Sequence, residues 1–335
     1  MTKMGQVFLL AILLAAASCQ DEGEVTQDGP LVVTPLGRIR GVEGTTERGT
    51  TFLKFTKVPF AEPPLGYLRL RKPVKKQPWT EELDGTQATP ACPQIDLLTN
   101  SSKGQEDCLF LNIFTPITNV EDIGQADLKP VMLWIHGGGF TGGDATTLTD
   151  PEFLLDEDVV FVAIQYRLGV LGFLAEENSA DLPGNLGLRD QQEAMRWVQG
   201  NIASFGGDPA KVTATTTTLL IIKMTIFGES AGAVSVHLHI LSPPAKGLFR
   251  AGILQSGTAL LSYEKFISKA TEMQGRKVLE ALGCADSEER LFCLQSPDIE
   301  EFIDPELGVM CLKVVDTQNQ TYFSVLGCKE IFSPM

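Results

Sequence analysis

The stretch KMTIFGESAGAVSVHLHIL, residues 223–241, decides the fold of this chain. Residues 223–227, KMTIF, predict the strand that precedes the turn, and residues 231–241 contain no proline and predict a helix. Between them, GESAG at residues 228–232 fits the pattern G-x-S-x-G. In that pattern a serine lies on a sharp turn from strand to helix, where side chains in place of the two glycines would clash. The stretch therefore predicts Ser230 as a nucleophile.

Other apolar runs predict the sheet into which this turn is built. They are continuous rather than alternating, which is typical of strands covered by helices on both faces. The expected strands are residues 108–114, 131–135, 159–166 and 253–256, and the expected helices are residues 187–202 and 264–282. Residues 58–95 are rich in proline, so no long helix is expected there. The alternation predicts a single α/β domain with a mostly parallel sheet and helices on both faces.

A second glycine motif, HGGGF at residues 136–140, directly follows one of the predicted strands. Its N–H groups can approach a ligand with no side chains in the way, as in an oxyanion hole. Gly138 and Gly139, with Ala231 after the serine, are the candidate donors. The alternatives are a flexible loop or a phosphate cradle, but a cradle would end in Gly-Lys-Ser or Gly-Lys-Thr, which this loop does not.

Composition excludes several classes of protein. The chain has 335 residues, of which 43% are hydrophobic, so disorder, collagen and coiled coil are excluded. Asp and Glu number 42 against 27 Lys and Arg, which gives a formal net charge of −15. Nucleic acid is therefore not an expected partner. No pattern in the sequence sets an oligomeric state.

The N-terminus predicts a secretory signal peptide over residues 1–19. Lys3 precedes an apolar run at residues 7–17, which ends in small residues suited to cleavage. A bacterial lipoprotein site ending at Cys19 is the alternative. The apolar run is shorter than the roughly 20 residues that a membrane helix needs, and no later run reaches that length. We therefore expect residues 20–335 to form the mature domain, secreted and without a transmembrane segment.

The cysteine content fits an oxidising compartment. Seven cysteines are present, and Cys19 falls in or beside the signal peptide. The other six are Cys92, Cys108, Cys284, Cys293, Cys311 and Cys328, whose pairing is open on cysteine count alone. No two of them have C-x-x-C spacing, so neither a metal site nor a cofactor is expected. Asn100 and Asn319 begin glycosylation sequons, which fit the secretory route.

Over residues 31–294 the chain resembles the type-B carboxylesterases, the cholinesterase and carboxylesterase family of the α/β-hydrolase fold. Six motifs occur in the family's order: PFAEPPLGYLRLRKP at 59–73, EDCLFLNIFTP at 106–116, WIHGGGF at 134–140, YRLGVLGF at 166–173, PGNLGLRDQ at 183–191 and FGGDPAKVT at 205–213. The resemblance implies hydrolysis of small-molecule carboxylic esters, with no cofactor, through an acyl-enzyme on Ser230.

The resemblance also implies covalent and ionic links. Cys92 would pair with Cys108 and Cys284 with Cys293. Two structural ion pairs would join Arg69 to Glu106 and Arg167 to Asp190. The two disulfides would bracket loops that shape the entrance to the site. The sequence leaves open whether Cys311 and Cys328 pair or stay free.

The chain departs from the family pattern at residues 214–225, ATTTTLLIIKMT. The family passes directly from K-V-T, here residues 211–213, to I-F-G-E-S. Because Lys223 and Thr225 repeat the Lys-x-Thr pattern, residues 223–227 can still supply the strand while the extra residues loop out. A loop of this size costs little closure entropy. We interpret the insert as retained non-coding sequence or an error of gene prediction.

The second departure concerns the general base. A serine hydroxyl needs a positioned histidine, oriented by a carboxylate, to become a good nucleophile. His237 and His239 lie seven and nine residues beyond Ser230 on the predicted helix, about 10 Å or more along its axis. His136 opens the glycine loop, where the resemblance implies a structural role, and Glu229 points away from the serine. The catalytic acid and histidine are therefore expected to be absent from this chain.

We accordingly predict a serine carboxylic ester hydrolase that is C-terminally incomplete and inactive as a 335-residue chain. Two alternatives stay open at this point. One is a non-catalytic, cholinesterase-like protein used for binding or adhesion, against which the intact Ser230 argues. The other is a gene-model fragment that does not fold stably.

Overall fold

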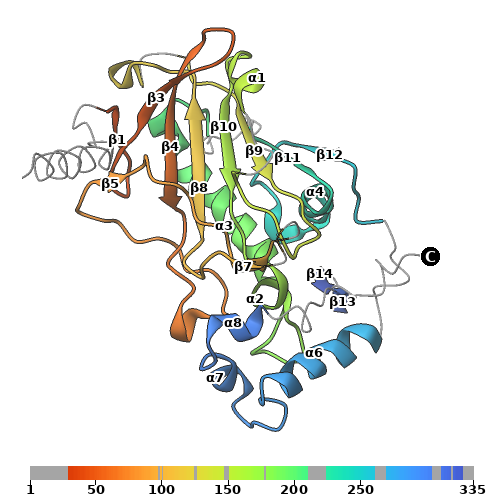
Figure 1. The fold of residues 1–335 in the computed structure, drawn as a ribbon. Coiled ribbons are helices and arrows are strands. Elements are labelled where there is room, and N and C mark those ends of the chain that lie inside the picture. The colour runs from red at the N-terminus through yellow and green to blue at the C-terminus, as the bar shows by residue number, and fades with distance from the viewer. Residues whose placement is uncertain are drawn as a thin grey trace, which may run out of the picture.

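The structure is a computed structural model, which describes residues 29–96, 99, 101–123, 127–146, 151–176, 179–209, 224–260, 269–303, 311–317 and 320–326. Its centre is a seven-stranded sheet in the order β12-β11-β9-β10-β8-β4-β3 (Figure 1). The strands are β3 (Val42–Thr45), β4 (Thr51–Pro59), β8 (Phe110–Thr115), β9 (Val131–Ile135), β10 (Val160–Ile164), β11 (Met224–Glu229) and β12 (Ala251–Gln255). The sheet is mixed: β12, β11, β9 and β10 are parallel, and β8, β4 and β3 continue it in antiparallel pairs.

Two long helices cover one face of the sheet. They are α3 (Leu186–Asn201) and α4 (Ala231–Leu241), and their apolar side chains join the main core with the strands between them. Trp197 and Val236 lie on these helices, and Leu133 and Ile226 lie on the strands beneath; all four are at most 4% exposed. The continuous apolar strands of the sequence are buried in this layer, as their pattern predicts.

A row of aromatic rings lines the opposite face. Phe114 contacts Phe161 edge-on at 5.8 Å between ring centroids, and Phe161 contacts Phe227 in the same way at 6.1 Å. The short helix α1 (Glu152–Leu155) packs Leu155 against this row. Both faces of the sheet therefore carry helix, which agrees with the fold class that the sequence predicts.

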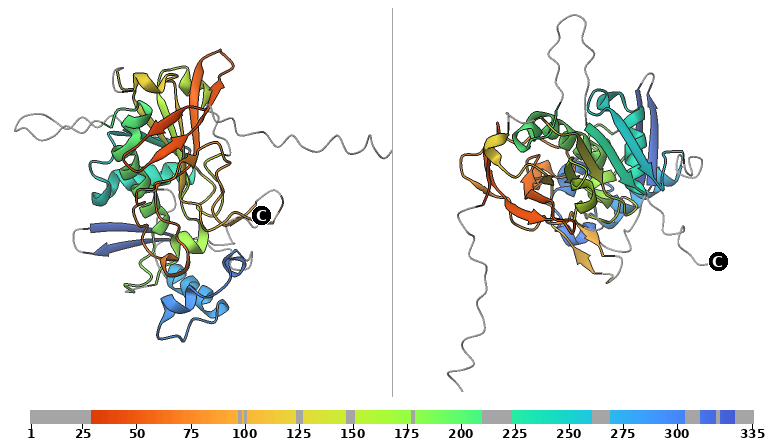
Figure 2. Two further views of the ribbon diagram at one scale, coloured as in Figure 1. Left: turned by 90° about the vertical axis from the view of Figure 1, so that its left-hand side faces the viewer. Right: turned by 90° about the horizontal axis from the view of Figure 1, so that it is seen from above.

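A second core forms at one end of the strands, where three C-terminal helices gather beside α2 (Figures 1 and 2). The C-terminal helices are α6 (Lys269–Ala281), α7 (Arg290–Leu294) and α8 (Ile299–Phe302), and α2 is Gly169–Phe173. Residues 264–268, the start of the helix that the sequence predicts before Gly283, lie outside the described residues. Leu171, Leu279 and Leu294 are buried in this cluster.

Short strands form three smaller sheets. One contains β1 (Leu31–Val33), β2 (Arg38–Arg40) and β5 (Leu83–Asp84), another pairs β6 (Gln94–Ile95) with β7 (Ser102–Lys103), and the last is the hairpin of β13 (Cys311–Thr317) and β14 (Gln320–Leu326). The proline-rich residues 58–95 contain no helix other than the three-residue 3₁₀ helix Gly66–Leu68, which agrees with the expectation of no long helix there. Within the insert, Met224 and Thr225 belong to β11, and residues 214–223 lie outside the described part of the chain.

Candidate active site

Ser230 lies on the turn between β11 and α4, where the sequence predicts a nucleophile. Its backbone has φ 52° and ψ −117°, outside the regions that serine ordinarily adopts. Such a conformation costs on the order of 1–3 kcal/mol and persists only where the surroundings enforce it. The enforcing contacts are short: Ser230 N donates to Gln255 O at 2.8 Å, and Val234 N donates to Ser230 O at 3.0 Å.

The glycines on either side of the serine are required by close backbone packing. A methyl group on Gly228 would lie 2.5 Å from Gly232 C and 2.6 Å from Ile135 O. A methyl group on Gly232 would overlap Ile135 O and lie 3.0 Å from His136 O. The end of β9 thus presses directly against the turn, which is why the sequence pattern needs glycine at both positions.

A further turn, at the end of β12, supports the serine, and no sequence motif predicts this role. Gln255 supplies the carbonyl that accepts from Ser230 N. Gly257 lies so close to Ser230 O that a side chain there would overlap it. In the sequence, Gly257 is distinguished only as a glycine that follows an apolar strand. The contact joins segments that the sequence does not show to be neighbours.

The glycine loop lies against the serine turn. A methyl group on Gly137 would lie 3.3 Å from Ser230 Cβ and 2.8 Å from both Glu229 O and Glu229 Oε2. Gly138 and Gly139 follow with φ of 99° and 61°, a backbone region that favours glycine. The structure therefore brings two predicted site segments together, and Ala231 begins α4 beside them.

Packing on both sides holds the glycine loop. Phe140 is buried with φ 64°, contacts Phe173 edge-on at 5.3 Å, and accepts a hydrogen bond at its carbonyl from Gly169 N at 2.8 Å. At the other end, His136 stacks on Tyr166 at 4.3 Å, and Tyr166 OH donates to His136 O at 2.9 Å. These contacts fix the two ends of the loop.

All three histidines of the chain are described, and each has a local role. His136 is buried and its Nδ1 donates to Gly137 O at 2.8 Å. His237 Nδ1 accepts from Ala259 N at 3.1 Å. His239 is buried and its Nε2 donates to Gln191 Oε1 at 2.7 Å. None of these histidines hydrogen-bonds to Ser230.

Burial keeps two of the histidines neutral. It lowers the pKa of His136 from 6.5 to about 4, against weaker opposing effects of the Gly137 carbonyl and Asp144. It lowers the pKa of His239 to about 3, with a smaller contribution from the positive charge of Arg196. His136 is thus a poor candidate for a replacement base, because it is fully enclosed and its Nδ1 proton is held by the adjacent carbonyl.

These shifts predict that the free energy of unfolding decreases as the pH is lowered from 7 to about 4. Between about pH 6.5 and pH 4 the unfolded chain protonates both histidines, whereas the folded chain does not, so unfolding is favoured as pH falls. Each histidine contributes at most about 1.4 kcal/mol per pH unit to the dependence of the free energy of unfolding on pH. Urea unfolding at pH 7, 6 and 5 measures this slope, and His239→Gln should remove one share of it. A free energy of unfolding that stays level between pH 7 and pH 5 contradicts the prediction.

The structure contains the disulfides and ion pairs that the resemblance implies. Cys92 is bonded to Cys108 and Cys284 to Cys293. Two bidentate ion pairs join Arg69 to Glu106 and Arg167 to Asp190, with N–O distances of 2.6–2.8 Å. Cys311 begins β13, whereas Cys328, Asn100 and Asn319 lie outside the described residues.

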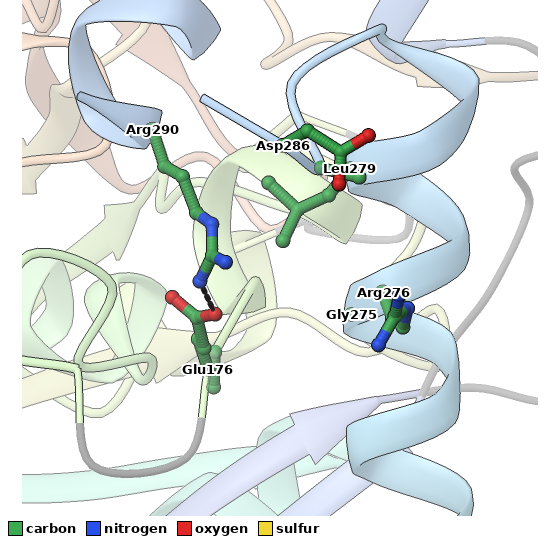
Figure 3. Close-up of a pocket in the computed structure, with 8 residues that line it drawn as sticks. Glu176, Gly275, Arg276, Leu279, Asp286 and Arg290 are labelled. Atoms are coloured by element: carbon green, nitrogen blue, oxygen red, sulfur yellow. Dashed lines mark hydrogen bonds and ion pairs between the residues drawn. The ribbon is translucent and has the colours of Figure 1, made fainter. Parts of the chain in front are cut away.

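A pocket of about 230 Å³ lies away from the serine, beside α6 (Figure 3). Its walls include Glu176, Arg276, Asp286 and Arg290, and an ion pair joins Glu176 to Arg290. The lining charges are of both signs, and none of the lining residues belongs to the serine turn or the glycine loop. Across the described residues, no group of His, Cys, Asp and Glu side chains could hold a metal ion, and no helix is long and apolar enough to cross a bilayer.

The mixed sheet, the strained serine between β11 and α4, and the adjoining glycine loop together define the α/β-hydrolase fold. The chain belongs to the carboxylesterase family, which matches residues 28–325.

Three curated relatives illustrate the similarity. The chain is 38% identical over 277 residues to a carboxylic ester hydrolase of Bombus ignitus, covering 81% of this chain and 46% of that protein. It is 40% identical over 306 residues to carboxylesterase 1E of Mus musculus, covering 85% and 50%. It is 38% identical over 328 residues to the cholinesterase of Mus musculus, covering 92% and 50%. The chain thus spans about half the length of the curated relatives it matches.

Proposed function

We propose that this chain carries the nucleophile and the oxyanion hole of a secreted serine carboxylic ester hydrolase. Ser230 Oγ attacks the ester carbonyl, the alcohol leaves, and water then hydrolyses the acyl-enzyme. The N–H groups of Gly138, Gly139 and Ala231 hold the negative oxygen of each tetrahedral intermediate. The observation that carries the proposal is the contact between Gly137 and Ser230, whose Cβ is 3.3 Å from the position of a Gly137 methyl group.

In this proposal, no residue of the 335-residue chain acts as the general base or as the acid that orients it. Support comes from the three histidines, of which His136 and His239 are buried in other hydrogen bonds and His237 accepts from Ala259 N. Without a positioned base, the chain alone hydrolyses esters slowly, retaining only what the oxyanion hole supplies. The two disulfides favour the oxidising route of secretion.

A non-catalytic binding or adhesion protein is the second candidate. It would have no need for a serine held at φ 52° by contacts on both sides. Strain of this kind is typical of functional sites. The observation therefore favours the hydrolase.

The test supplies the absent base in solution. We expect imidazole to raise the rate at which the purified chain hydrolyses p-nitrophenyl butyrate, recovering part of the roughly 10²–10⁴-fold that a positioned base contributes. Imidazole also attacks this ester directly, so the measured quantity is the difference between the chain and its Ser230→Ala variant. Mass spectrometry of the peptide that contains Ser230 should detect the butyryl group.

The result has clear alternatives. An imidazole-dependent rate that is the same in Ser230→Ala, with no acyl group on the peptide, contradicts the nucleophile assignment. Rapid serine-dependent hydrolysis without imidazole contradicts the external base and leaves the nucleophile assignment intact.

A further inference from the structure

The glycine loop cannot hold its own shape. The chain continues from Phe140 into Thr141, Gly142 and Gly143, and the extended glycine loop, residues 137–143, reads GGGFTGG, in which five of the seven residues are glycine. Glycine has the largest conformational freedom in the unfolded chain, and such a segment stays ordered only through contacts from outside it. The contacts of Phe140 and His136 hold its first half. A separate support is needed for its second half.

Gln94 supplies that support from another part of the chain. It lies on β6, two residues after Cys92 of the disulfide, and is 4% exposed. Its Nε2 donates to Gly143 O at 2.8 Å and to Cys92 O at 3.0 Å, while its Oε1 accepts from Gly143 N at 2.9 Å. The side-chain amide thus pairs with both backbone groups of Gly143, as a neighbouring strand would.

Gly143 packs directly against the first residues of the glycine loop, which contain the candidate oxyanion donors. Its φ is 97°, and a methyl group on it would lie 2.5 Å from Gly137 O and 2.7 Å from His136 Nδ1. One residue earlier, Gly142 N donates to Gly138 O at 3.0 Å. A shift of Gly143 would therefore displace Gly137 and Gly138, the segment that lies against the serine.

We propose that Gln94 is a positioning residue that holds the glycine loop, and with it the N–H groups of Gly138 and Gly139, in the geometry of the oxyanion hole. The role in catalysis rests on the function proposed above, whereas the role in ordering the loop does not. Losing the amide would leave the N–H and C=O of Gly143 without their partner in a partly buried place, and the loop would move to find others.

A weaker link between the same segments provides a matched control. Lys103 Nζ lies 3.0 Å from Asp96 Oδ2 and 3.8 Å from Asp144 Oδ2, and its side chain is 38% exposed. Exposed ion pairs of this kind contribute little. A second control is Gln199, far along the chain, whose Nε2 donates to Gly247 O at 2.7 Å.

The experiment compares Gln94→Leu and Gln94→Glu with Lys103→Met and Gln199→Leu by amide hydrogen exchange. In both Gln94 variants we expect exchange in residues 137–143 to be roughly 10- to 100-fold faster, with α3 and β10 unchanged. Gln94→Glu loses both donated hydrogen bonds but keeps an oxygen that can accept from Gly143 N. It therefore stays informative if the leucine variant does not fold. The two controls should leave exchange in the loop unchanged.

The serine-dependent, imidazole-supported rate is the second readout. Gln94→Leu should lower it by at least about tenfold, toward the 10²–10³-fold that a lost oxyanion donor costs. Unchanged exchange in the loop overturns the proposal, as does faster exchange spread equally over the whole chain. Faster loop exchange in a protein whose wild type shows no serine-dependent rate upholds the ordering role of Gln94 and rejects the proposed function instead.

Discussion

Asp190→Ala should lower the free energy of unfolding by about 3–5 kcal/mol, the cost of leaving one member of a buried ion pair without its partner. The side chains of Arg167 and Asp190 are 3% and 0% exposed. Both Arg167 Nε and its backbone N donate to Asp190 Oδ2, at 2.8 and 3.1 Å. In the variant the guanidinium would stay charged with nothing to replace the carboxylate.

The double variant Arg167→Met with Asp190→Leu is the control. It removes both charges and keeps apolar volume, but the backbone N–H of residue 167 still loses its acceptor, so we expect a loss of about 1–3 kcal/mol, smaller than that of Asp190→Ala. Urea unfolding at neutral pH, followed by circular dichroism, measures all the variants. A double variant that is as unstable as Asp190→Ala would show that volume, not charge, decides the effect.

Gly232→Ala should damage both stability and catalysis. Its methyl group would overlap Ile135 O and lie 2.9 Å from Ile135 C, and β9 cannot retreat because it is paired on both sides, with β10 and with β11. Overpacking of this kind costs about 1–3 kcal/mol and at times more. Displacing the turn would also move the Ala231 N–H, so the serine-dependent rate should fall by roughly 10²–10³-fold.

Gly200→Ala is the matched control for that change. Gly200 lies on α3, and no atom lies within 4 Å of the added methyl group. We expect this variant to be more stable than the wild type by roughly 0.5–1 kcal/mol, since alanine favours helix over glycine. Its serine-dependent rate should be unchanged. Equal losses in the two variants would mean that the clash at Gly232 is not the cause.

The parts of the fold that short sequence patterns determine were predictable. The sequence predicts a strand at 223–227 and a helix at 231–241, and the structure has Met224–Glu229 and Ala231–Leu241. The turn between them is local, because the glycines and the serine that it needs are consecutive in the chain. The glycine loop was predictable for the same reason.

Support from distant segments was not predictable from those patterns. Gln94 acts as a substitute for a peptide group, and no spacing or residue type marks a glutamine for that role. Gln255 and Gly257 contact Ser230 only because β12 pairs with β11, which is a property of the assembled sheet. The hairpin of β13 and β14 likewise falls where the sequence showed no recognisable motif.

The unusual backbone of Ser230 is present in the folded chain before any ester binds. The backbone of the serine turn is set once, as the protein folds, and the packing around the turn maintains it afterwards. Under the proposed function, an ester would therefore meet a turn that is already formed, and substrate binding would not have to organise it.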